Sequence, residues 1–300
     1  MQPEKNSLER GIILKSLGGL YFVENTAAPG CVLECRARGI FRKENISPCA
    51  GDFCKVENGV ITEIYPRRNY IVRPPLANLD CMVFVISTCQ PAPCFLVADK
   101  FIAVCENKGI EPIVAVTKSD LQSDEGIAET YGKIGISAIT VDYGKDPAAQ
   151  AVMDKIKGKV SAFTGNTGVG KSTLLNHLFP RLEVETAEIS QKLGRGRHTT
   201  RTSELYAIEG GGYIADTPGF SSFDTNRYDI IYKEDLKYCF REFGEFEGKC
   251  RFADCSHTAE KGCAVIDAVN RGVIPKSRHD SYLAMYEDAK KLKEWELQKR

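Results

Sequence analysis

The fold of this chain is decided by one stretch, VSAFTGNTGVGKSTLLNHL, at residues 160–178. It joins a β-rich apolar run to a helical one through the full G-x-x-x-x-G-K-S pattern, from Gly165 to Ser172. The glycines let backbone N–H groups turn toward phosphate oxygens, and the following helix adds the positive end of its dipole. Lys171 is expected to reach the β and γ phosphates, and Ser172 to ligate Mg²⁺. The stretch therefore predicts a nucleotide-binding α/β domain.

The regions around this phosphate loop alternate between expected strands and helices. Short runs rich in apolar and β-branched residues predict strands, and longer amphipathic runs predict helices. In chain order, the expected strands are CMVFVIST (81–88), PIVAVTK (112–118), AITV (138–141), VSAFTG (160–165), ELYAI (204–208) and YIADT (213–217), with a hairpin turn at 210–212. The expected helices cover 94–109, 122–132, 147–157 and 171–179. This alternation predicts a doubly wound parallel sheet.

A second phosphate-binding element lies downstream of the loop, at Asp216-Thr217-Pro218-Gly219. At the end of a strand, an Asp can hold Mg²⁺ through water, and the N–H of the Gly can meet a γ-phosphate. Together with the phosphate loop, the motif indicates a GTPase-type switch. Phe220 follows where many GTPases carry a water-orienting Gln, so hydrolysis without help should be slow.

The basic segment GRGRHTTRT, residues 194–202, lies between these two motifs. It supplies Thr199 or Thr200 as a ligand for Mg²⁺ and the γ-phosphate, and either Thr suits the role. His198 is the nearest candidate to position the attacking water or to contact a partner. The alternative for His198 is an ordinary solvent-exposed loop residue.

Base selection is assigned to the tetrad Thr117-Lys118-Ser119-Asp120, which follows an apolar run. It matches the guanine motif Asn-Lys-x-Asp except that Thr replaces Asn. The Asp120 carboxylate can accept two hydrogen bonds from guanine, whereas adenine would leave that charge unpaired. Lys118 would stack its stem over the base, and the hydroxyl of Thr117 predicts moderate guanine affinity. If the tetrad were a chance strand end, ATP would be an alternative.

The order of these motifs is the diagnostic feature of the chain. Ordinary GTPases place the guanine motif last, but here it precedes the phosphate loop, which indicates circular permutation. The segment after Gly219 therefore leads directly into the C-terminal part, so a nucleotide-ordered switch can move that part. The expected nucleotide site contains Thr117, Lys118, Ser119, Asp120, Gly165, Asn166, Thr167, Gly168, Val169, Gly170, Lys171, Ser172, Thr173, Asp216 and Gly219. Its expected magnesium ligands are Ser172, Thr199, Thr200 and Asp216, and its expected catalytic residues are Lys171, His198, Thr199 and Thr200.

The N-terminal part predicts a small barrel of five short strands. They are expected over LYFVEN (20–25), CVLECRARG (31–39), DFCKVENGVITEIYP (52–66) and NYIVRP (69–74), with Asn58-Gly59 as the strongest hairpin signal. An oligonucleotide/oligosaccharide-binding (OB) barrel fits this pattern, and a small SH3-like barrel would look similar. Arg36, Arg38, Arg42 and Lys43 cluster near Phe41, which suits either a nucleic-acid face or a charged strand edge that resists aggregation.

A compact Cys/His cluster follows the α/β part. Cys250, Cys255, His257 and Cys263 have the spacing C-x4-C-x-H-x5-C, which can close a tetrahedron around one Zn²⁺ ion. Four protein ligands leave no open position, so the expected site is structural. The alternative is a coincidental set of free thiols, but this segment has few apolar residues with which to build a core. A charged helix is expected from about Ser277 onward.

Composition agrees with an ordinary globular protein. The 300 residues carry 40 basic and 40 acidic side chains, with mildly basic ends and an acidic middle. No run of 18 apolar residues and no signal-peptide pattern is present, so we expect a cytoplasmic chain with reduced thiols. Packing roles are expected for Cys31, Cys35, Cys49, Cys54, Cys81, Cys89, Cys94, Cys105 and Cys239.

Taken together, these motifs resemble the ribosome small-subunit-dependent GTPase A family of bacterial assembly factors over nearly the whole chain. The resemblance is carried by RPPLANLD (73–80), TKSD (117–120), GNTGVGKST (165–173), GRHTTR (196–201), DTPGFSS (216–222) and the Cys/His cluster. Thr117 departs from the usual Asn, and ITVD at 139–142 is a weak match for the remaining guanine-contacting loop.

The resemblance implies three domains: an OB barrel at 1–73, a permuted GTPase domain at 74–235 and a mainly α zinc-binding domain at 236–300. It also implies a Mg²⁺-dependent GTPase that binds 16S rRNA of the small ribosomal subunit late in maturation. The subunit would stimulate hydrolysis, release would follow, and a monomer is expected. Two other hypotheses stay open: an RNA-binding module that uses GTP only as a conformational ligand, and a regulator with a protein partner.

Overall fold

The computed structural model describes residues 6–43, 46–143, 146–180, 203–216 and 229–291. These residues pack into two compact units. The first unit contains residues 6–81 and the described parts of 153–163 and 175–216, and the second contains the described parts of 82–152, 164–174 and 229–291. Among the helices of these ranges, none is long and apolar enough to cross a membrane.

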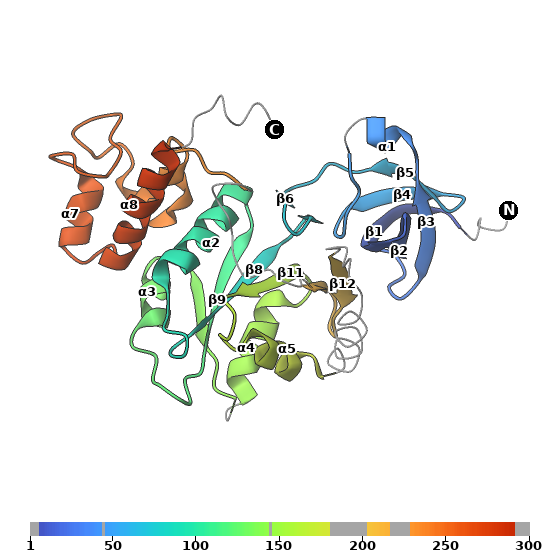
Figure 1. Ribbon diagram of the computed structural model, residues 1–300, viewed down its shortest axis with the longest axis horizontal. Helices are drawn as coiled ribbons and strands as arrows, with labels where there is room; N and C mark the ends of the chain where they lie inside the picture. Colours follow the sequence, from blue (N-terminus) through green and yellow to red (C-terminus); the bar gives the residue numbers. More distant parts are fainter. Residues whose placement is uncertain (1–5, 44–45, 144–145, 181–202, 217–228, 292–300) are drawn as a thin grey trace. The chain divides into compact units, whose positions relative to one another are not determined.

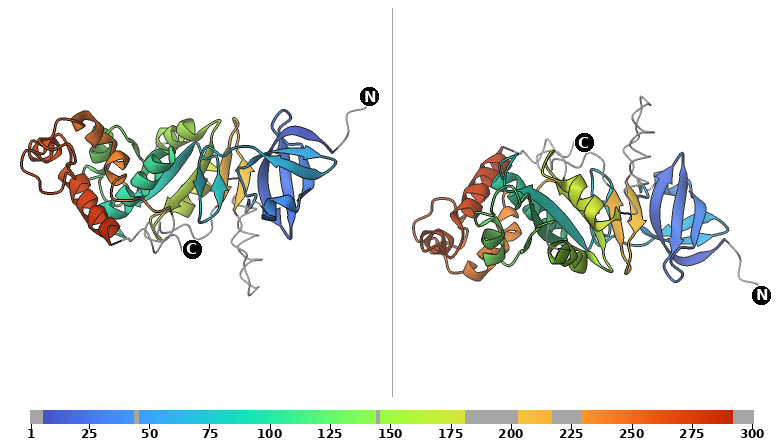
Figure 2. Two further views of the ribbon diagram at one scale, coloured as in Figure 1. Left: turned by 90° about the horizontal axis from the view of Figure 1, so that it is seen from above. Right: turned by 90° about the horizontal axis from the view of Figure 1, so that it is seen from below.

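The first unit begins with a closed five-stranded barrel (Figures 1 and 2). Its strands are β1 (Leu8–Leu17), β2 (Leu20–Asn25), β3 (Val32–Ala37), β4 (Phe53–Glu57) and β5 (Val60–Ile64), in the order β1-β2-β3-β5-β4. β3 and β5 are parallel, and an antiparallel pairing of β1 with β4 closes the barrel. This order, with the short helix α1 (Ile40–Lys43) between β3 and β4, confirms an OB barrel over an SH3-like one.

Two expectations about the barrel strands need correction. The run at 69–74 does not join the barrel, because Tyr70–Ile71 forms a two-residue strand, β6, that pairs with β7 (Leu76–Ala77). Its place in the barrel is taken by β1, which no expected strand covered. β1 does not alternate simply between buried and exposed residues, because it contains a bulge after Ile13 and both Ile12 and Ile13 are completely buried.

The cysteines outside the Cys/His cluster divide into two groups. Burial agrees with the expected packing role at Cys35, Cys49, Cys54, Cys81, Cys105 and Cys239, and Cys89 is half-buried. The packing role was wrong for Cys31 and Cys94, which are exposed. Cys31 lies in the turn before β3, and Cys94 lies at the start of a helix, where neither thiol reaches a core.

A six-stranded α/β sheet contains the expected strands. They are β8 (Cys81–Ser87), β9 (Glu111–Thr117), β10 (Ser137–Thr140), β11 (Val160–Gly165), β12 (Glu204–Ala207) and β13 (Tyr213–Asp216), in the order β10-β9-β8-β11-β13-β12. β9 is parallel to β10, and β11 is parallel to β13. β12 and β13 form the expected antiparallel hairpin. The antiparallel strand β12 lies at one edge of the sheet.

The helices between these strands also agree with the sequence, with one shifted boundary. They are α2 (Phe95–Lys108), α3 (Ile127–Lys133), α4 (Asp146–Ile156) and α5 (Lys171–Leu178). α3 starts later than the expected residue 122 because the Asp124 carboxylate accepts hydrogen bonds from the N–H groups of Ile127 at 2.6 Å and Ala128 at 3.2 Å. These are the first donors of the helix after its N-cap Gly126, so the Asp124 carboxylate satisfies them where α3 begins.

The C-terminal part of the second unit is helical. It contains the 3₁₀ helices η1 (Leu236–Cys239) and η2 (Arg241–Phe246), followed by α7 (Ala264–Asn270) and α8 (Lys276–Lys290). Within residues 229–291 there is no strand, which confirms a mainly α segment. α8 packs along α2 (Figure 1).

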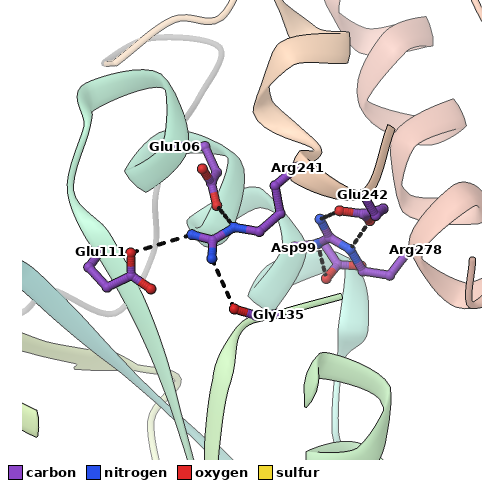
Figure 3. A network of polar contacts seen from close by, with 7 residues as sticks. All are labelled: Asp99, Glu106, Glu111, Gly135, Arg241, Glu242 and Arg278. Carbon is purple, nitrogen blue, oxygen red and sulfur yellow. Dashed lines mark hydrogen bonds and ion pairs between the residues drawn. The ribbon is translucent and has the colours of Figure 1, made fainter. Parts of the chain in front are cut away.

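A buried ion-pair network joins the C-terminal helices to α2 (Figure 3). Arg278 on α8 is fully buried and donates to Asp99 at 2.6 Å and to Glu242 at 2.8 Å. Burial alone would lower the pKa of Arg278, but these two carboxylates raise it above its usual value. Burial raises the pKa of Asp99 against the opposing effect of Arg278. Each charge is therefore tolerated in this interior only because of the other.

We expect Arg278→Met to destabilise the second unit by about 3–5 kcal/mol, because two buried carboxylates lose their cation. Urea denaturation followed by circular dichroism measures the change. Arg241→Met is the matched control, because Arg241 pairs with Glu106 at 2.6 Å and Glu111 at 3.5 Å in a partly solvated setting. That control should cost about 1 kcal/mol or less. Equal losses for both variants would contradict the importance of complete burial.

Candidate nucleotide-binding site and metal centre

The phosphate loop has the backbone that its glycines predict. Gly165, Gly168 and Gly170 have φ angles of 155°, 81° and 89°, which favour glycine over residues with a Cβ. A Cβ on Gly165 would lie only 2.5 Å from the Val85 carbonyl oxygen in β8. The loop then enters α5, where the Leu174 N–H donates to Gly170 O at 2.9 Å. Strand end, loop and helix N-terminus thus follow one another as phosphate binding requires.

Thr117 connects the guanine motif to the phosphate loop. Its side chain is completely buried at the end of β9, and its hydroxyl donates to Val169 O in the phosphate loop at 2.5 Å. The Ile86 carbonyl oxygen lies farther from the same hydroxyl, at 3.3 Å. From the sequence, Thr117 was expected only as a weaker contact to the base. The structure shows a second role for it, the connection of two loops that are 52 residues apart.

We expect Thr117→Val to weaken GDP and GTP binding by roughly tenfold, because Val169 O loses its donor in a buried position. Thr117→Ser keeps the hydroxyl and is the matched control, with affinity near that of the unmodified chain. Titration with a fluorescent guanine nucleotide measures both. If Val and Ser variants bind equally well, the hydroxyl does not hold the two loops together.

Lys118 lies in a strained turn that faces the end of β8. Its φ angle is 62°, an uncommon conformation for a residue with a side chain. The Lys118 carbonyl accepts a hydrogen bond from the Thr88 hydroxyl at 2.8 Å, and its ammonium donates to the Gln90 carbonyl. Thr88 and Gln90 were not expected to take part in the site. Both residues closely follow β8, which ends at the same edge of the sheet as β9. That placement is the sequence signal that could have predicted their part in the site.

The remaining two residues of the tetrad point in different directions. The Ser119 hydroxyl donates to Val141 O at 2.8 Å, which joins the tetrad to the residues after β10. Val141 belongs to the weak ITVD match, so the structure brings that segment beside the guanine motif. The Asp120 side chain is exposed and makes no hydrogen bond to the described residues. Its carboxylate is thus available to a ligand, as guanine recognition requires.

The switch residues are placed only in part. Asp216 is the last residue of β13, which pairs with β11 in parallel register from Val160 opposite Tyr213 to Ala162 opposite Ala215. The backbone of Asp216 is therefore at the level of the residues that lead into the phosphate loop. The expected residues His198, Thr199, Thr200 and Gly219 lie outside the described ranges.

The Cys/His cluster comes together as one compact set of ligand atoms. The Sγ and Nδ1 atoms of Cys250, Cys255, His257 and Cys263 all lie within 4.8 Å of one another. Cys250 Sγ is 3.9 Å from Cys263 Sγ and 3.6 Å from His257 Nδ1, and the latter is 3.4 Å from Cys263 Sγ. Tetrahedral Zn²⁺ with bonds of about 2.3 Å to sulfur and about 2.0 Å to nitrogen needs separations of about 3.8 Å and about 3.5 Å. The four residues therefore fit a zinc ion.

Surrounding groups orient these ligands. The Ile266 N–H at the start of α7 donates to Cys263 Sγ at 3.5 Å, and the Ala264 N–H donates to Cys250 Sγ at 3.4 Å. Such donors favour sulfur with negative charge. The His257 carbonyl lies 2.8 Å from His279 Nε2 on α8, and the pKa of His257 is lowered by burial. Metals bind the neutral form of imidazole, and the contact with His279 fixes the loop that carries His257.

Comparisons with known proteins agree with this geometry. Residues 64–226 match the family model of the RsgA GTPase, and residues 10–63 match that of the RsgA N-terminal domain. The chain belongs to the RsgA GTPase family. A relative from Caldanaerobacter subterraneus subsp. tengcongensis, the small ribosomal subunit biogenesis GTPase RsgA, is 40% identical over 94% of this chain and 96% of its own.

Solved structures of similar proteins have the same fold. The crystal structure of YjeQ from Thermotoga maritima has a TM-score of 0.80 and 29% identity, over 95% of this chain and 99% of that one. The crystal structure of YloQ, a circularly permuted GTPase, has a TM-score of 0.78 and 34% identity, over 95% and 96%. As an RsgA-family member, this chain is a circularly permuted GTPase with an N-terminal OB barrel, and a C-terminal Cys/His cluster follows.

Proposed function

We propose that this chain binds the maturing small ribosomal subunit through its 16S rRNA and hydrolyses GTP to GDP and phosphate when the subunit stimulates it. The GTPase part of the proposal is carried by the Thr117 bond between guanine motif and phosphate loop. It occurs in a chain whose relatives are named small ribosomal subunit biogenesis GTPases. Such relatives support a role in ribosome assembly. We further propose that the chain acts in the cytoplasm and as a monomer. Release after hydrolysis would couple each GTP to one assembly step.

We assign the nucleotide site to the residues expected from the motifs. Asp120 selects guanine, the loop from Gly165 to Thr173 holds the phosphates, and Lys171 stabilises charge that develops during phosphoryl transfer. Ser172 and Asp216 offer the hard oxygen ligands that Mg²⁺ prefers, and a Mg²⁺ ion held there would help neutralise the phosphate charge. Thr199 or Thr200 and His198 complete this proposed set, and Gly219 meets the γ-phosphate.

We also propose three functional domains, at 1–73, 74–235 and 236–300. The OB barrel suits single-stranded nucleic acid, since such barrels bind oligonucleotides on the face of their second and third strands. Arg36 and Arg38 lie at and just after the end of β3, on that part of the barrel. The C-terminal domain holds one structural zinc ion through its three cysteines and His257.

The test is GTP turnover by the purified chain with and without purified small ribosomal subunits, with ATP as the control nucleotide. Stimulation by small subunits with ATP inert supports both the partner and the role of Asp120. Turnover that subunits leave unchanged would reject the partner while leaving the GTPase assignment in place. A shallow salt dependence of subunit binding would favour a protein contact over RNA phosphates.

A further inference from the structure

A groove of about 530 Å³ opens in the C-terminal part of the second unit. Residues of η1, η2 and the loop that carries the metal ligands line it. We propose that this groove binds unpaired bases of single-stranded RNA by stacking them on Tyr238 and Phe252. The proposal rests on the proposed function and adds to it a specific site for the RNA.

Two aromatic rings at this groove face solvent. Tyr238 is 61% exposed and Phe252 is 47% exposed, whereas nearby Phe240 and Phe243 are buried. Rings left so open add little to the stability of the fold. A cation lies over one face of each ring, so a planar base would stack on the opposite face.

Each of these rings has a cation beside it. The Lys237 ammonium lies 5.1 Å from the centroid of the Tyr238 ring, and the Arg251 guanidinium carbon lies 5.6 Å from that of Phe252. A positive group next to a stacking surface suits RNA, because each base is attached to a sugar-phosphate backbone with one negative charge per residue. The lining therefore contains two pairs that combine an aromatic ring with a cation.

The charges of Lys237 and Arg251 contact aromatic rings rather than carboxylates. Among the residues that the structure describes, Lys237 and Arg251 form no ion pair. Arg241 also lines the groove, but its guanidinium is bound to Glu106 and Glu111 (Figure 3). Glu247 is the carboxylate in the lining. An acidic peptide would neutralise the two available cations but leave the rings without a partner, so RNA fits better.

The metal-binding loop positions half of this groove. Arg251 and Phe252 lie between the ligands Cys250 and Cys255 in the chain, so the fold of the loop fixes their backbone. The Arg251 N–H also donates to Gly262 O at 2.9 Å, which closes the loop on itself. A rigid base for a stacking ring reduces the entropy lost on binding. Double-stranded RNA keeps its bases stacked on one another, so it should bind this groove poorly.

The experiment uses the full chain with zinc and a single-stranded RNA of about 12 nucleotides that carries 4-thiouridine, a length within the range for such sites. Fluorescence anisotropy measures its dissociation constant, and photo-cross-linking with mass spectrometry locates the contact. The double variant Tyr238→Ala/Phe252→Ala should bind about fivefold or more weakly and lose cross-links in residues 237–257. Tyr238→Trp/Phe252→Trp keeps two stacking surfaces and should bind like the unmodified chain. Tyr232→Ala is the matched control, because Tyr232 is 40% exposed and lies outside the groove.

Unchanged affinity in the alanine variant, together with cross-links only elsewhere, would overturn the proposal. So would an alanine variant that binds RNA normally but loses the small subunit, because the groove would then contact a ribosomal protein. The proposed function fails separately, when small subunits neither bind nor stimulate the unmodified chain. If that happens, cross-links in the groove would still support an RNA site there. Conversely, normal stimulation by small subunits without cross-links in the groove would reject only the proposed RNA site.

Discussion

Lys171→Ala should reduce GTP turnover on the order of a thousandfold, with or without small ribosomal subunits. Lys171 is the first residue of α5, directly after the loop whose glycines turn backbone N–H groups toward the phosphates. Its ammonium would neutralise charge that grows on the β and γ phosphates as the terminal bond breaks. Phosphate release under saturating GTP measures the loss.

Lys155→Ala is the control for this variant. Lys155 is an exposed lysine in the last turn of α4, so its removal changes the net charge equally without touching the loop. The control should hydrolyse GTP normally. Near-normal turnover by Lys171→Ala would remove the phosphate-loop assignment, even if the fold were intact by circular dichroism.

Loss of zinc should unfold the C-terminal part of the second unit. The purified chain is expected to contain about one zinc ion, and binding of structural zinc contributes on the order of 10 kcal/mol in small zinc domains. Cys263→Ser or a strong chelator should therefore remove the metal and lower the thermal stability of this part. Elemental analysis and thermal unfolding followed by circular dichroism measure the two effects.

Cys239→Ala separates a metal ligand from an ordinary buried thiol. Cys239 is buried in η1 and lies outside the four-residue cluster, and burial raises its pKa to about 12, so it stays a neutral packing group. This variant should keep its zinc, although a small cavity lowers its stability slightly. A purified chain without zinc, stable to chelators, would reject the metal centre.

Contiguous motifs made the nucleotide and metal sites predictable. The phosphate loop is encoded by eight consecutive positions whose glycines allow one particular backbone, so its conformation needs little help from distant residues. The Cys/His spacing likewise restricts the ligands to a short loop, and the structure brings all four together. The permuted order of the motifs can be read directly from their positions along the chain.

Other features of the site depended on residues far apart in the chain. The Thr117 hydroxyl could reach Val169 only because β9 and β11 end at the same edge of one sheet. Thr88 and Gln90 entered the site for the same reason. A one-dimensional pattern shows that a residue lies at a strand end, but it does not show which other strand end lies next to it.

The amino-acid sequence alone determined that this chain has a phosphate loop, a guanine motif placed before it and a four-ligand Cys/His loop, because each is a local pattern whose chemistry depends on neighbouring residues. Only the tertiary structure decided that β1 closes the barrel and that Arg278 is buried between Asp99 and Glu242. It also decided that two aromatic rings with their cations line one groove. The reason is physical: burial and pairing of charges arise from packing between segments, and the free energy of that packing is not a property of any one segment.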